Sequence, residues 1–468
     1  MNPLVLSDEQ YREVFEQITQ RALAYVSSIP ERRILPAASG SDTEALFRKP
    51  LPEHGMGVQV LDDLGLVIDN VRVAGPGFFG YVLGSGEPVA AAADLLASVL
   101  NQNVTAWRSG PSAATVERVV VGWLAEAIGC QGFTGSLTGG GSSANLMALA
   151  MAREARLPAN EAGARPGTVY ASEQVHMSIP KAIALLGIGR DNLRLIPCDD
   201  QFRIRIDLVR QTIEKDIRAG VTPIAVVGSA GTVATGSIDD INRLAEIAQG
   251  FDAWFHVDGA YGALAAIAEP AKFLGMNRAD SMSLDPHKWL YQPLDCGCLL
   301  FRDAAAAQRA FSHTGDYAKS LIDDPVEGFV FFEESMELSR RFRALKLWLS
   351  LRYHGMGNFR EAMRNDLAMA QHLAECIANE ARLELSAPVA LSAVCFRYLP
   401  QAGGDSDKLN QEILRGVNRR GRVFLSNASI YGKFALRACI VNHRTTASDV
   451  ERVVSEVLEV GREMERVS

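Results

Sequence analysis

The sequence predicts an α/β protein with a mostly parallel central sheet, and two observations carry this prediction. Runs of four to six mainly apolar residues alternate with helical stretches through the middle of the chain. Apolar runs of this length between helices are typical of parallel strands buried on both faces. The 468 residues, 48% hydrophobic and 22% charged, are enough for two or three domains with their own cores.

The first part of the sequence is helical. Residues 8–28 have the apolar spacing of an amphipathic helix, and a stretch rich in proline and glycine follows over residues 30–57. Residues 91–128 are helical again, with Pro111 as a helix start. Because the segment 1–87 is too small for a core of its own, we expect its apolar stripe to pack on a partner subunit.

The alternating middle part supplies the sheet, and residues 88–358 form the expected large domain. Its predicted strands are GTVYAS, LRLIP, PIAVVG, AWFHVD, DSMSLD and GCLLF. After a long helix over residues 339–355, the strands ALSAVCFRY and FALRACIVN and a final helix over residues 448–465 follow. This last pattern predicts a small C-terminal α+β domain, residues 359–468.

Charge and cysteine content narrow the classes of function. A net charge of -8, a pI near 5.6 and the absence of a long Lys/Arg cluster argue against nucleic acid or an anionic membrane as the partner. Seven scattered cysteines indicate neither a disulfide framework nor a zinc cluster, and Cys296 and Cys298 fit a buried strand better than a metal site. With no basic, apolar leader and no run of about 18 apolar residues, we expect a cytoplasmic protein with a small-molecule substrate.

A glycine-rich loop opens one predicted helix, in LTGGGSSANLMALAMARE. The free backbone N–H groups and the dipole of such a helix start favour an anion. The loop lacks the lysine of a P-loop, and its G-x-G-x-x-A spacing lacks the strand, helix and acid of a dinucleotide site. The alternative is an ordinary glycine turn with Ser142 or Ser143 as the N-cap of the helix.

Two further strand ends carry polar residues. Asp258 ends the run AWFHVD, where a buried carboxylate needs a cationic or hydrogen-bonding partner unless it caps the next segment. The small residues that follow it, Gly259, Ala260 and Gly262, leave space for a flat group. His176 follows GTVYAS and precedes a helix, where a structural or capping histidine is the alternative to a functional one.

Lys288 lies in SLDPHKWL, just after the run DSMSLD. It follows Asp258 by one strand–helix–strand unit, so we expect both side chains at neighbouring strand ends, where such sheets collect their ligands. Asp285 is expected to frame the turn by hydrogen bonds rather than to balance the charge of the lysine.

One ligand accounts for an anion cradle, a carboxylate, a small-residue floor, a stacking imidazole and a lysine: pyridoxal 5'-phosphate (PLP). A lysine that loses its proton in a dry pocket forms the imine that holds the aldehyde of PLP. An aspartate keeps the pyridine nitrogen protonated, so that the ring withdraws electrons. We therefore predict PLP as the cofactor and no metal.

The blocks TGGGSSANLMAL, SEQVHMSIPKA, FHVDGAYGA, SLDPHKWLYQPLDCG and SRRFRALKLWLSLRYHG resemble, in this order, the group II PLP-dependent amino-acid decarboxylases. That family includes the aromatic amino-acid, histidine, glutamate and cysteine-sulfinate decarboxylases. The resemblance extends from about Phe78 to near the end of the sequence. It implies the PLP-dependent transferase fold type I, which is aspartate-aminotransferase-like, and a homodimer whose active sites lie at the interface.

The resemblance also implies roles for individual residues. Lys288 would form the Schiff base, Asp258 would pair with the pyridinium and His176 would stack on the ring opposite Ala260. Lys288, Asp258 and His176 are the implied catalytic residues. The remaining implied cofactor contacts are Gly140, Gly141, Ser142 and His287 at the phosphate and Thr232 near the ring.

The reaction implied is decarboxylation of an L-amino acid to an amine, with His176 and Lys288 nearest to return a proton to Cα. In the aromatic members a loop tyrosine supplies this proton. Counting back from RRFR without gaps, the corresponding residue is Phe331, in the expected mobile loop. Phenylalanine there is associated with oxygen-dependent conversion to an aldehyde, so an aldehyde synthase is an alternative. An aminotransferase, which would need an arginine clamp for the carboxylate, and a non-catalytic relative are two others.

Substrate contacts follow from the same alignment. Tyr81 and Val82 would line the pocket, and Thr105 and Trp107 would reach it from the partner chain. Thr105 stands where the aromatic enzymes have a bulky ring, which argues against an aromatic substrate without indicating another. Arg437 would contact the substrate carboxylate or, alternatively, form a structural ion pair.

Overall fold

The structure, a computed structural model, describes residues 2, 4–313, 324–401 and 405–467. A seven-stranded sheet with the order β1-β7-β6-β5-β4-β2-β3 forms its centre. Strands β3, β2, β4, β5 and β6 are parallel, and β7 is antiparallel to both of its neighbours. The predicted mostly parallel sheet is confirmed. The strands are β1 (Thr134–Thr138), β2 (Gly167–Ser172), β3 (Leu193–Ile196), β4 (Thr222–Ser229), β5 (Trp254–Asp258), β6 (Ser281–Leu284) and β7 (Gly297–Phe301).

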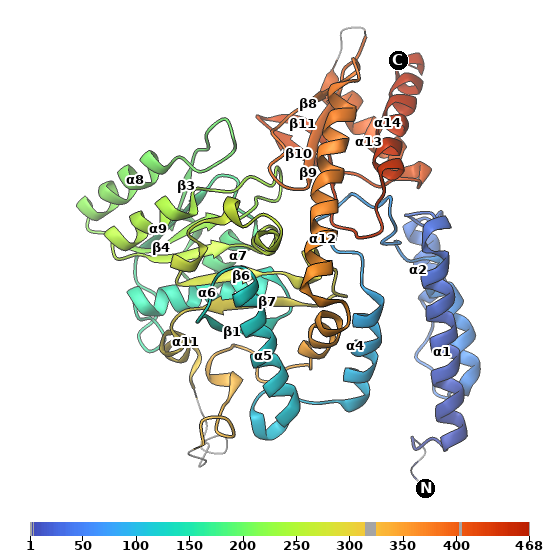
Figure 1. Cartoon of the computed structure of the whole chain (residues 1–468), viewed down its shortest axis with the longest axis horizontal. Helices are drawn as coiled ribbons and strands as arrows, with labels where there is room; N and C mark the ends of the chain where they lie inside the picture. Colours follow the sequence, from blue (N-terminus) through green and yellow to red (C-terminus); the bar gives the residue numbers. More distant parts are fainter. Residues whose placement is uncertain (1, 3, 314–323, 402–404, 468) are drawn as a thin grey trace.

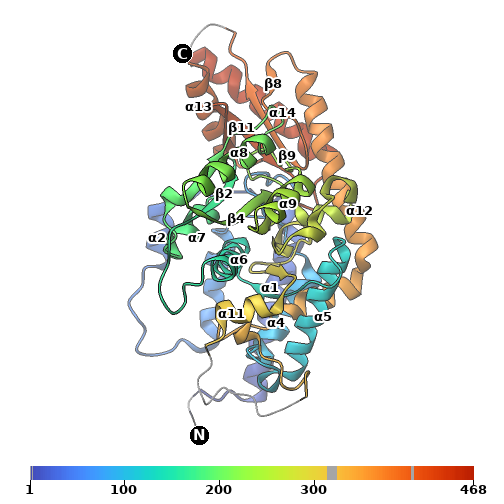
Figure 2. The same ribbon diagram turned by 90° about the vertical axis from the view of Figure 1, so that its left-hand side faces the viewer.

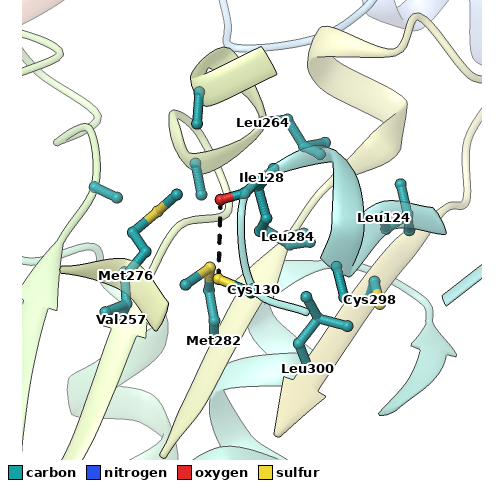
Figure 3. Close-up of a cluster of buried hydrophobic side chains, with 14 of the residues drawn as sticks. Leu124, Ile128, Cys130, Val257, Leu264, Met276, Met282, Leu284, Cys298 and Leu300 are labelled. Atoms are coloured by element: carbon teal, nitrogen blue, oxygen red, sulfur yellow. Dashed lines mark hydrogen bonds between the residues drawn. The ribbon is translucent and has the colours of Figure 1, made fainter. Parts of the chain in front are cut away.

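Helices cover both faces of this sheet (Figure 1). One core joins the sheet to α5 (Pro111–Ala127), α8 (Ile206–Arg218) and α9 (Ile241–Gly250). The other core joins it to α6 (Gly141–Arg156), α7 (Ser178–Leu185) and α11 (Ala304–Phe311). Figure 3 shows the first core, where Leu124 and Ile128 of the α5 region meet Met282 and Leu284 of β6. The parallel strands in the middle of the sheet therefore bury apolar side chains on both faces.

A second, smaller sheet lies beside the first and is antiparallel throughout, with the order β10-β11-β9-β8. Its strands are β8 (Leu383–Leu385), β9 (Ala393–Tyr398), β10 (Ser426–Ile430) and β11 (Lys433–Cys439). Helices α13 (Ser406–Arg420) and α14 (Ala447–Val467) pack on it around a separate core. The long helix α12 (Ala344–Ala378) runs from the large sheet to the small one and is broken at Gly355, where φ is +75° (Figure 1).

Helices α1 and α2 lie at the right-hand edge of the molecule in Figure 1, and α1 lies behind the rest of the chain in Figure 2. The N-terminal helices are α1 (Asp8–Ser28), α2 (Gly40–Phe47), α3 (Leu64–Asp69) and α4 (Pro88–Leu100). The predicted helix over residues 8–28 is confirmed, and Ser7 and Gln10 form a capping box at its start. No residue of α1 is buried within this chain, so its apolar side chains remain available for another surface.

Strand β1 was not among the predicted runs. Its sequence, TGSLT, is mostly polar, and the strand lies at one edge of the sheet. Neighbouring elements cover it there, although few of its own side chains are apolar. Four of its five residues are nevertheless buried. Within the described ranges, every helix is too short or too polar to cross a bilayer.

Candidate active site

A cavity of about 440 Å³ opens at the carboxyl ends of β1, β2, β4, β5 and β6. This is the edge at which an open α/β sheet collects ligands. Every residue predicted to contact the cofactor lines the cavity, and so do Tyr81, Val82 and Arg437, whereas Thr105 and Trp107 do not. The cofactor set in its wall is Gly140, Gly141, Ser142, His176, Thr232, Asp258, Ala260, His287 and Lys288.

The glycine loop forms a cradle that side chains would fill. Gly140 has a φ of +139°, and a Cβ at Gly141 would come within 2.6 Å of the Ala260 Cβ and 3.1 Å of Asp285 Oδ2. Helix α6 begins at Gly141 with Gly140 as its N-cap and without a side-chain cap. The alternative, in which Ser142 or Ser143 caps the helix, is therefore wrong, and the first N–H groups of α6 are left for an anion.

Lys288 lies on the single-turn helix α10 (Pro286–Trp289), directly after β6. Its Nζ lies 2.7 Å from Asp285 Oδ2, and the aspartate is 3% exposed. Our expectation that Asp285 only frames the turn was wrong: the two residues are three positions apart on a tight turn, and their side chains form an ion pair. The second oxygen, Asp285 Oδ1, is buried without a hydrogen-bond partner among the described residues.

His287 lies beside the same cradle. The Cys296 N–H donates to its Nδ1 at 3.3 Å, and its Nε2 lies 3.5 Å from Asp285 Oδ2. Burial lowers the pKa of His287. The ring is therefore neutral near pH 7 and carries its proton on Nε2, as a donor beside the glycine loop.

Asp258 ends β5 with its carboxylate buried. Ser283 Oγ donates to Asp258 Oδ1 at 3.1 Å, and the Ala260 N–H is 3.4 Å away. No ion pair of Asp258 occurs within the described ranges, so its carboxylate is available to a cationic group of a ligand in the cavity. The weak contact to Ala260 does not make Asp258 a helix cap, because the next helical turn starts after Gly262.

His176 lines the cavity and also contacts the start of α7. Its Nδ1 accepts the Ser178 N–H at 3.2 Å and lies 2.8 Å from Ser178 Oγ. Burial lowers the pKa of His176. The capping alternative is therefore confirmed, since one ring nitrogen accepts at the start of α7, and the same ring also borders the cavity.

Arg437 of β11 reaches the cavity from the small sheet. It donates to the carbonyl oxygens of Val233 and Gly80 and to Ser426 Oγ. The alternative of a structural ion pair is wrong within the described part of the chain, because these three acceptors are uncharged. A guanidinium that is 6% exposed and has only neutral partners suits an anionic ligand group.

Phe331 lies in the core rather than in a mobile loop, and this expectation was wrong. Its side chain is fully buried, in edge-to-face contact with Phe329, and the Arg340 guanidinium lies 4.2 Å from its ring centre. Its backbone N–H donates to the Thr105 carbonyl at 2.9 Å. Thr105 and Phe331 thus belong to one paired segment outside the cavity of their own chain.

Several residues in the cavity wall escaped the sequence interpretation, among them Asp285 as the partner of Lys288. Leu294, Tyr261 and Ser229 also line the wall. The signal for Asp285 was present, because an acid three residues before a lysine on a helical turn faces it. Leu294 and Ser229 carry no comparable signal.

The residues present fit PLP. The glycine cradle excludes side chains and offers N–H donors to a phosphate, and Asp258 offers a buried carboxylate without a cation. Lys288 supplies an amine in the same cavity. Within the described ranges no group of three or more histidine, cysteine or acidic residues could hold a metal.

Comparison with known proteins agrees with this geometry. Residues 45–399 match the family model described as the pyridoxal-dependent decarboxylase conserved domain. The chain is 33% identical to an aromatic-L-amino-acid decarboxylase of Bacillus atrophaeus, over 98% of this chain and 97% of that protein.

Two solved structures share the whole fold. The crystal structure of Oryza sativa TDC with PLP and tryptamine has a TM-score of 0.92 and 27% identity, covering 99% of this chain and 100% of that one. The Rhodiola rosea 4-hydroxyphenylacetaldehyde synthase has a TM-score of 0.87 and 29% identity, covering 99% of each chain. The fold type I prediction is confirmed. The chain belongs to the pyridoxal-dependent decarboxylase family and is a PLP-dependent carboxy-lyase that acts on an L-amino acid.

Proposed function

We propose that Lys288 carries PLP and that Asp258 pairs with its ring nitrogen. His176 and Ala260 hold the two faces of the ring, with Thr232 beside it. The phosphate lies on the backbone of Gly140, Gly141 and Ser142 and on His287. One observation carries this proposal: all of these groups converge on a single cavity although they come from five different strand ends.

The protein groups then have distinct tasks in decarboxylation. When bound, PLP supplies the electron sink that accepts the bonding electrons of the Cα–carboxylate bond. Arg437 orients the substrate by its carboxylate, and the buried Asp258 keeps a positive charge at the ring nitrogen. Lys288 and His176 border the reacting carbon and return a proton to Cα, which yields the amine.

We propose an aromatic L-amino acid as the substrate. The relatives reported above include an aromatic-L-amino-acid decarboxylase and a structure that holds tryptamine. Val82, Leu294 and Tyr81 give the cavity an apolar rim, and Tyr81 is itself packed against Phe78 and Phe424. We infer that these relatives outweigh the argument from Thr105 against an aromatic substrate, because the small side chain, which we propose the partner chain supplies, leaves room for a bicyclic substrate ring.

Oxygen-dependent conversion to an aldehyde is the second candidate, and Phe331 is the observation that favours it. The sequence from residue 318 to residue 339 contains no tyrosine that could donate a proton. In that reaction the amino acid, O₂ and water give the aldehyde, CO₂, ammonia and hydrogen peroxide. The buried position of Phe331 in this chain weakens the candidate, because the ring is fixed against Arg340.

The products decide between these two reactions. Purified protein loaded with PLP is incubated with each of the twenty amino acids, with and without oxygen, and products are identified by mass spectrometry. We expect the amine of an aromatic amino acid and CO₂ in equal amounts, with no uptake of oxygen. Peroxide and an aldehyde would replace the decarboxylase proposal by the second candidate.

The Lys288→Ala variant tests the assignment of the site. We expect it to lose both amine formation and the absorbance of lysine-bound PLP, because Lys288 is the only lysine among the described residues that line the cavity. Lys272→Ala provides a matched control, since that lysine lies outside this cavity and donates to the Ala390 carbonyl. A Lys288→Ala variant that kept the absorbance would show that PLP binds elsewhere.

The proposal extends to assembly and location. We propose a homodimer with shared active sites, in which residues 1–87 pack on the partner subunit beside the large domain, residues 88–358, and the small domain, residues 359–468. The absence of any buried residue in α1 supports this arrangement. We propose a cytoplasmic location, supported by seven cysteines that are all free thiols.

A further inference from the structure

A continuous chain of buried side-chain hydrogen bonds ends at His176. Trp254 Nε1 donates to Ser281 Oγ at 2.8 Å, and Ser281 Oγ lies 2.9 Å from His256 Nδ1. His256 Nε2 lies 2.9 Å from Asn145 Oδ1, and Asn145 Nδ2 donates to Ser178 Oγ at 2.8 Å. Ser178 Oγ contacts His176 Nδ1 at 2.8 Å. The chain thus crosses from the middle of the sheet, through α6, to the cavity.

All the inner members of this chain are closed to water. Asn145, Ser178, His256 and Ser281 are each at most 2% exposed. A buried polar group that lacks a partner is costly, so every hydrogen in the chain must lie between a donor and an acceptor. This condition determines where the protons are.

The two ends of the chain agree on one direction. The indole of Trp254 is only a donor, so the Ser281 hydroxyl hydrogen is free to point to His256 Nδ1. His256 then carries its proton on Nε2 and donates to Asn145 Oδ1. The Asn145 amide donates to Ser178, whose hydroxyl donates to His176 Nδ1.

The opposite direction fails at its cavity end. With the Asn145 amide turned over, its oxygen would accept the Ser178 hydroxyl hydrogen. Ser178 Oγ would then face His176 Nδ1 at 2.8 Å with no hydrogen between them, because that nitrogen already accepts the Ser178 backbone N–H. Two acceptors at this distance repel each other.

We propose that Asn145 and His256 are positioning residues that hold His176 as the Nε2–H tautomer with a fixed ring plane. His176 then presents a proton on the nitrogen that this network leaves unbonded, in the cavity where substrate and cofactor meet. The inference deepens the proposed function. The catalytic use of this proton rests on the proposed function, but the tautomer of His176 does not.

Burial supports the same state of both rings. It lowers the pKa of His256 to about 4 and also lowers the pKa of His176. Both histidines are therefore neutral near pH 7, and each has one ring proton to place. The other charges that act on His176 are those of Asp258, Lys288, Asp285 and Lys181.

The Asn145→Asp substitution reverses the chain without changing its shape. A carboxylate accepts from His256 and from the Ser178 hydroxyl, so Ser178 can no longer donate to His176 Nδ1. The Ser178 oxygen then faces His176 Nδ1 without a hydrogen between them, and this repulsion favours the ring tautomer that carries its proton on Nδ1. We expect the population of Nε2–H tautomer to fall and kcat to fall roughly tenfold with KM little changed, because one hydrogen bond to a reacting group is lost.

The tautomer is measured in PLP-free protein by NMR of ¹⁵N-labelled histidine, whose eight residues give separable ring signals. The signals of His176 are assigned by their loss in His176→Gln. We expect the Nε2–H tautomer in the wild type and its loss in Asn145→Asp. An Nδ1–H wild type, or unchanged His176 signals in a folded Asn145→Asp protein, would overturn the proposal.

Two further variants keep the test decisive. Asn410→Asp places the same buried carboxylate in the small domain, where Asn410 is fully buried but bonds Tyr398 and Ser406. We expect it to lower stability while leaving the His176 signals unchanged. Ser178→Ala removes only the hydroxyl link and keeps the backbone donor, so we expect the Nε2–H tautomer to persist with a smaller loss of kcat, roughly threefold.

The outcomes separate this inference from the proposed function. A protein that forms no amine but shows the expected His176 tautomer would contradict the decarboxylase site and leave the network intact. A protein that forms amine but carries the ring proton of His176 on Nδ1 would support the decarboxylase site and contradict the network.

Discussion

Lys288 and Asp285 form the closest pair of opposite charges in the active-site cavity, with 2.7 Å between Nζ and Oδ2. An ion pair at this distance holds the lysine amine in a fixed orientation. If Lys288 carries PLP as proposed, the bond from Nζ to the aldehyde forms only after this ion pair is broken. Asp285 should therefore slow the covalent binding of PLP.

Asp285→Asn should speed the covalent binding of PLP to Lys288. The amide keeps the shape of the turn and removes the charge that pairs with the lysine. We expect the rate of PLP uptake to rise roughly tenfold. The measurement is the absorbance of lysine-bound PLP over time after mixing, and a rate that stays or falls would contradict the role of Asp285.

Asp258→Asn should lower kcat by roughly a hundredfold or more, since a charge-paired group buried beside the ring nitrogen is worth several kcal/mol. PLP should still bind to Lys288, so its absorbance remains. Asp280→Asn is the matched control: Asp280 precedes the opposite end of β6 and accepts the Phe255 N–H at 2.7 Å. Equal losses in both variants would point to a structural effect instead.

At the residue scale, the sequence predicted the residues that would contact the cofactor, but it missed the residues that hold them in place from elsewhere in the fold. Lys288, Asp258 and the glycine loop stand at strand ends, where a local pattern identifies them. His256 and Asn145 are 111 residues apart, and nothing in either neighbourhood shows that they bond. Such partners follow only from the packing of α6 against β5.

Among the elements, the segment around Arg340 ties the most parts together. Arg340 donates to the Val104 and Leu137 carbonyl oxygens at 2.9 and 2.8 Å and pairs with Glu117 of α5, and its side chain is fully buried. It also covers the Phe331 ring. One guanidinium thus joins α5, β1 and the paired segment of Thr105 and Phe331.

Arg340→Met should destabilise the protein by about 3–5 kcal/mol, because it leaves the Glu117 carboxylate buried without a cation, with the Leu137 N–H still donating to it. Urea unfolding followed by circular dichroism measures the change. Arg415→Met is the control, since the Arg415–Glu412 pair is exposed and should change the free energy of unfolding by less than about 1 kcal/mol. A cost for Arg340→Met as small as that of the control would remove Arg340 from this role.

Helix α12 contributes a buried acid that makes stability depend on pH. Tyr291 donates to Asp366 Oδ2 at 2.8 Å, and burial raises the pKa of Asp366 from 3.8 to about 7. The folded state therefore binds a proton that the unfolded state releases between these values. This contribution is complete below about pH 4 and is lost as the pH rises to 7.

Asp366→Asn should remove that dependence, because the amide is neutral at every pH and still accepts from Tyr291. At pH 8 we expect the variant to be more stable than the wild type by roughly 1–3 kcal/mol, and the difference should vanish or reverse near pH 4. Thermal unfolding across this pH range measures both. A wild type that gains stability from pH 4 to pH 7 as steeply as the variant would contradict the raised pKa.

The order of elements was predicted more completely than their directions and edges. Buried strands and amphipathic helices have a characteristic local spacing of apolar residues, so the middle of the sheet and the helix over residues 8–28 could be predicted. The polar strand β1 and the antiparallel direction of β7 depend on neighbours far along the chain. Neither leaves a local pattern.

At the scale of the whole molecule, the apolar side of helices α1 and α4 stays exposed in the single chain. Helix α1 has no buried residue, and α4 is half exposed along its apolar side. Large apolar residues exposed in this number favour an interface. The exposed large apolar residues on these helices are Tyr11, Ile18, Leu23, Val26, Leu95, Leu96, Val99 and Leu100.

A second copy of the chain should cover this face. We expect light scattering to give twice the 50.7 kDa mass of the chain. Leu23→Glu combined with Val26→Glu places two charges in the interface and should shift the protein toward monomers with loss of activity. A monomeric wild type that retains full activity would contradict the homodimer.

Shared active sites make a stronger prediction about mixtures of inactive chains. Thr105 does not line the cavity of its own chain, so a Thr105→Arg substitution should block only the site of the partner. A Lys288→Ala chain and a Thr105→Arg chain are each inactive as homodimers. In a mixed dimer, one site combines the intact Lys288 of the second chain with the intact Thr105 of the first. Since half of the dimers in an equal mixture are mixed and half of their sites are intact, refolding the two together should restore about a quarter of the activity. If mixed dimers form and remain inactive, Thr105 serves its own chain, and each site is complete within one subunit.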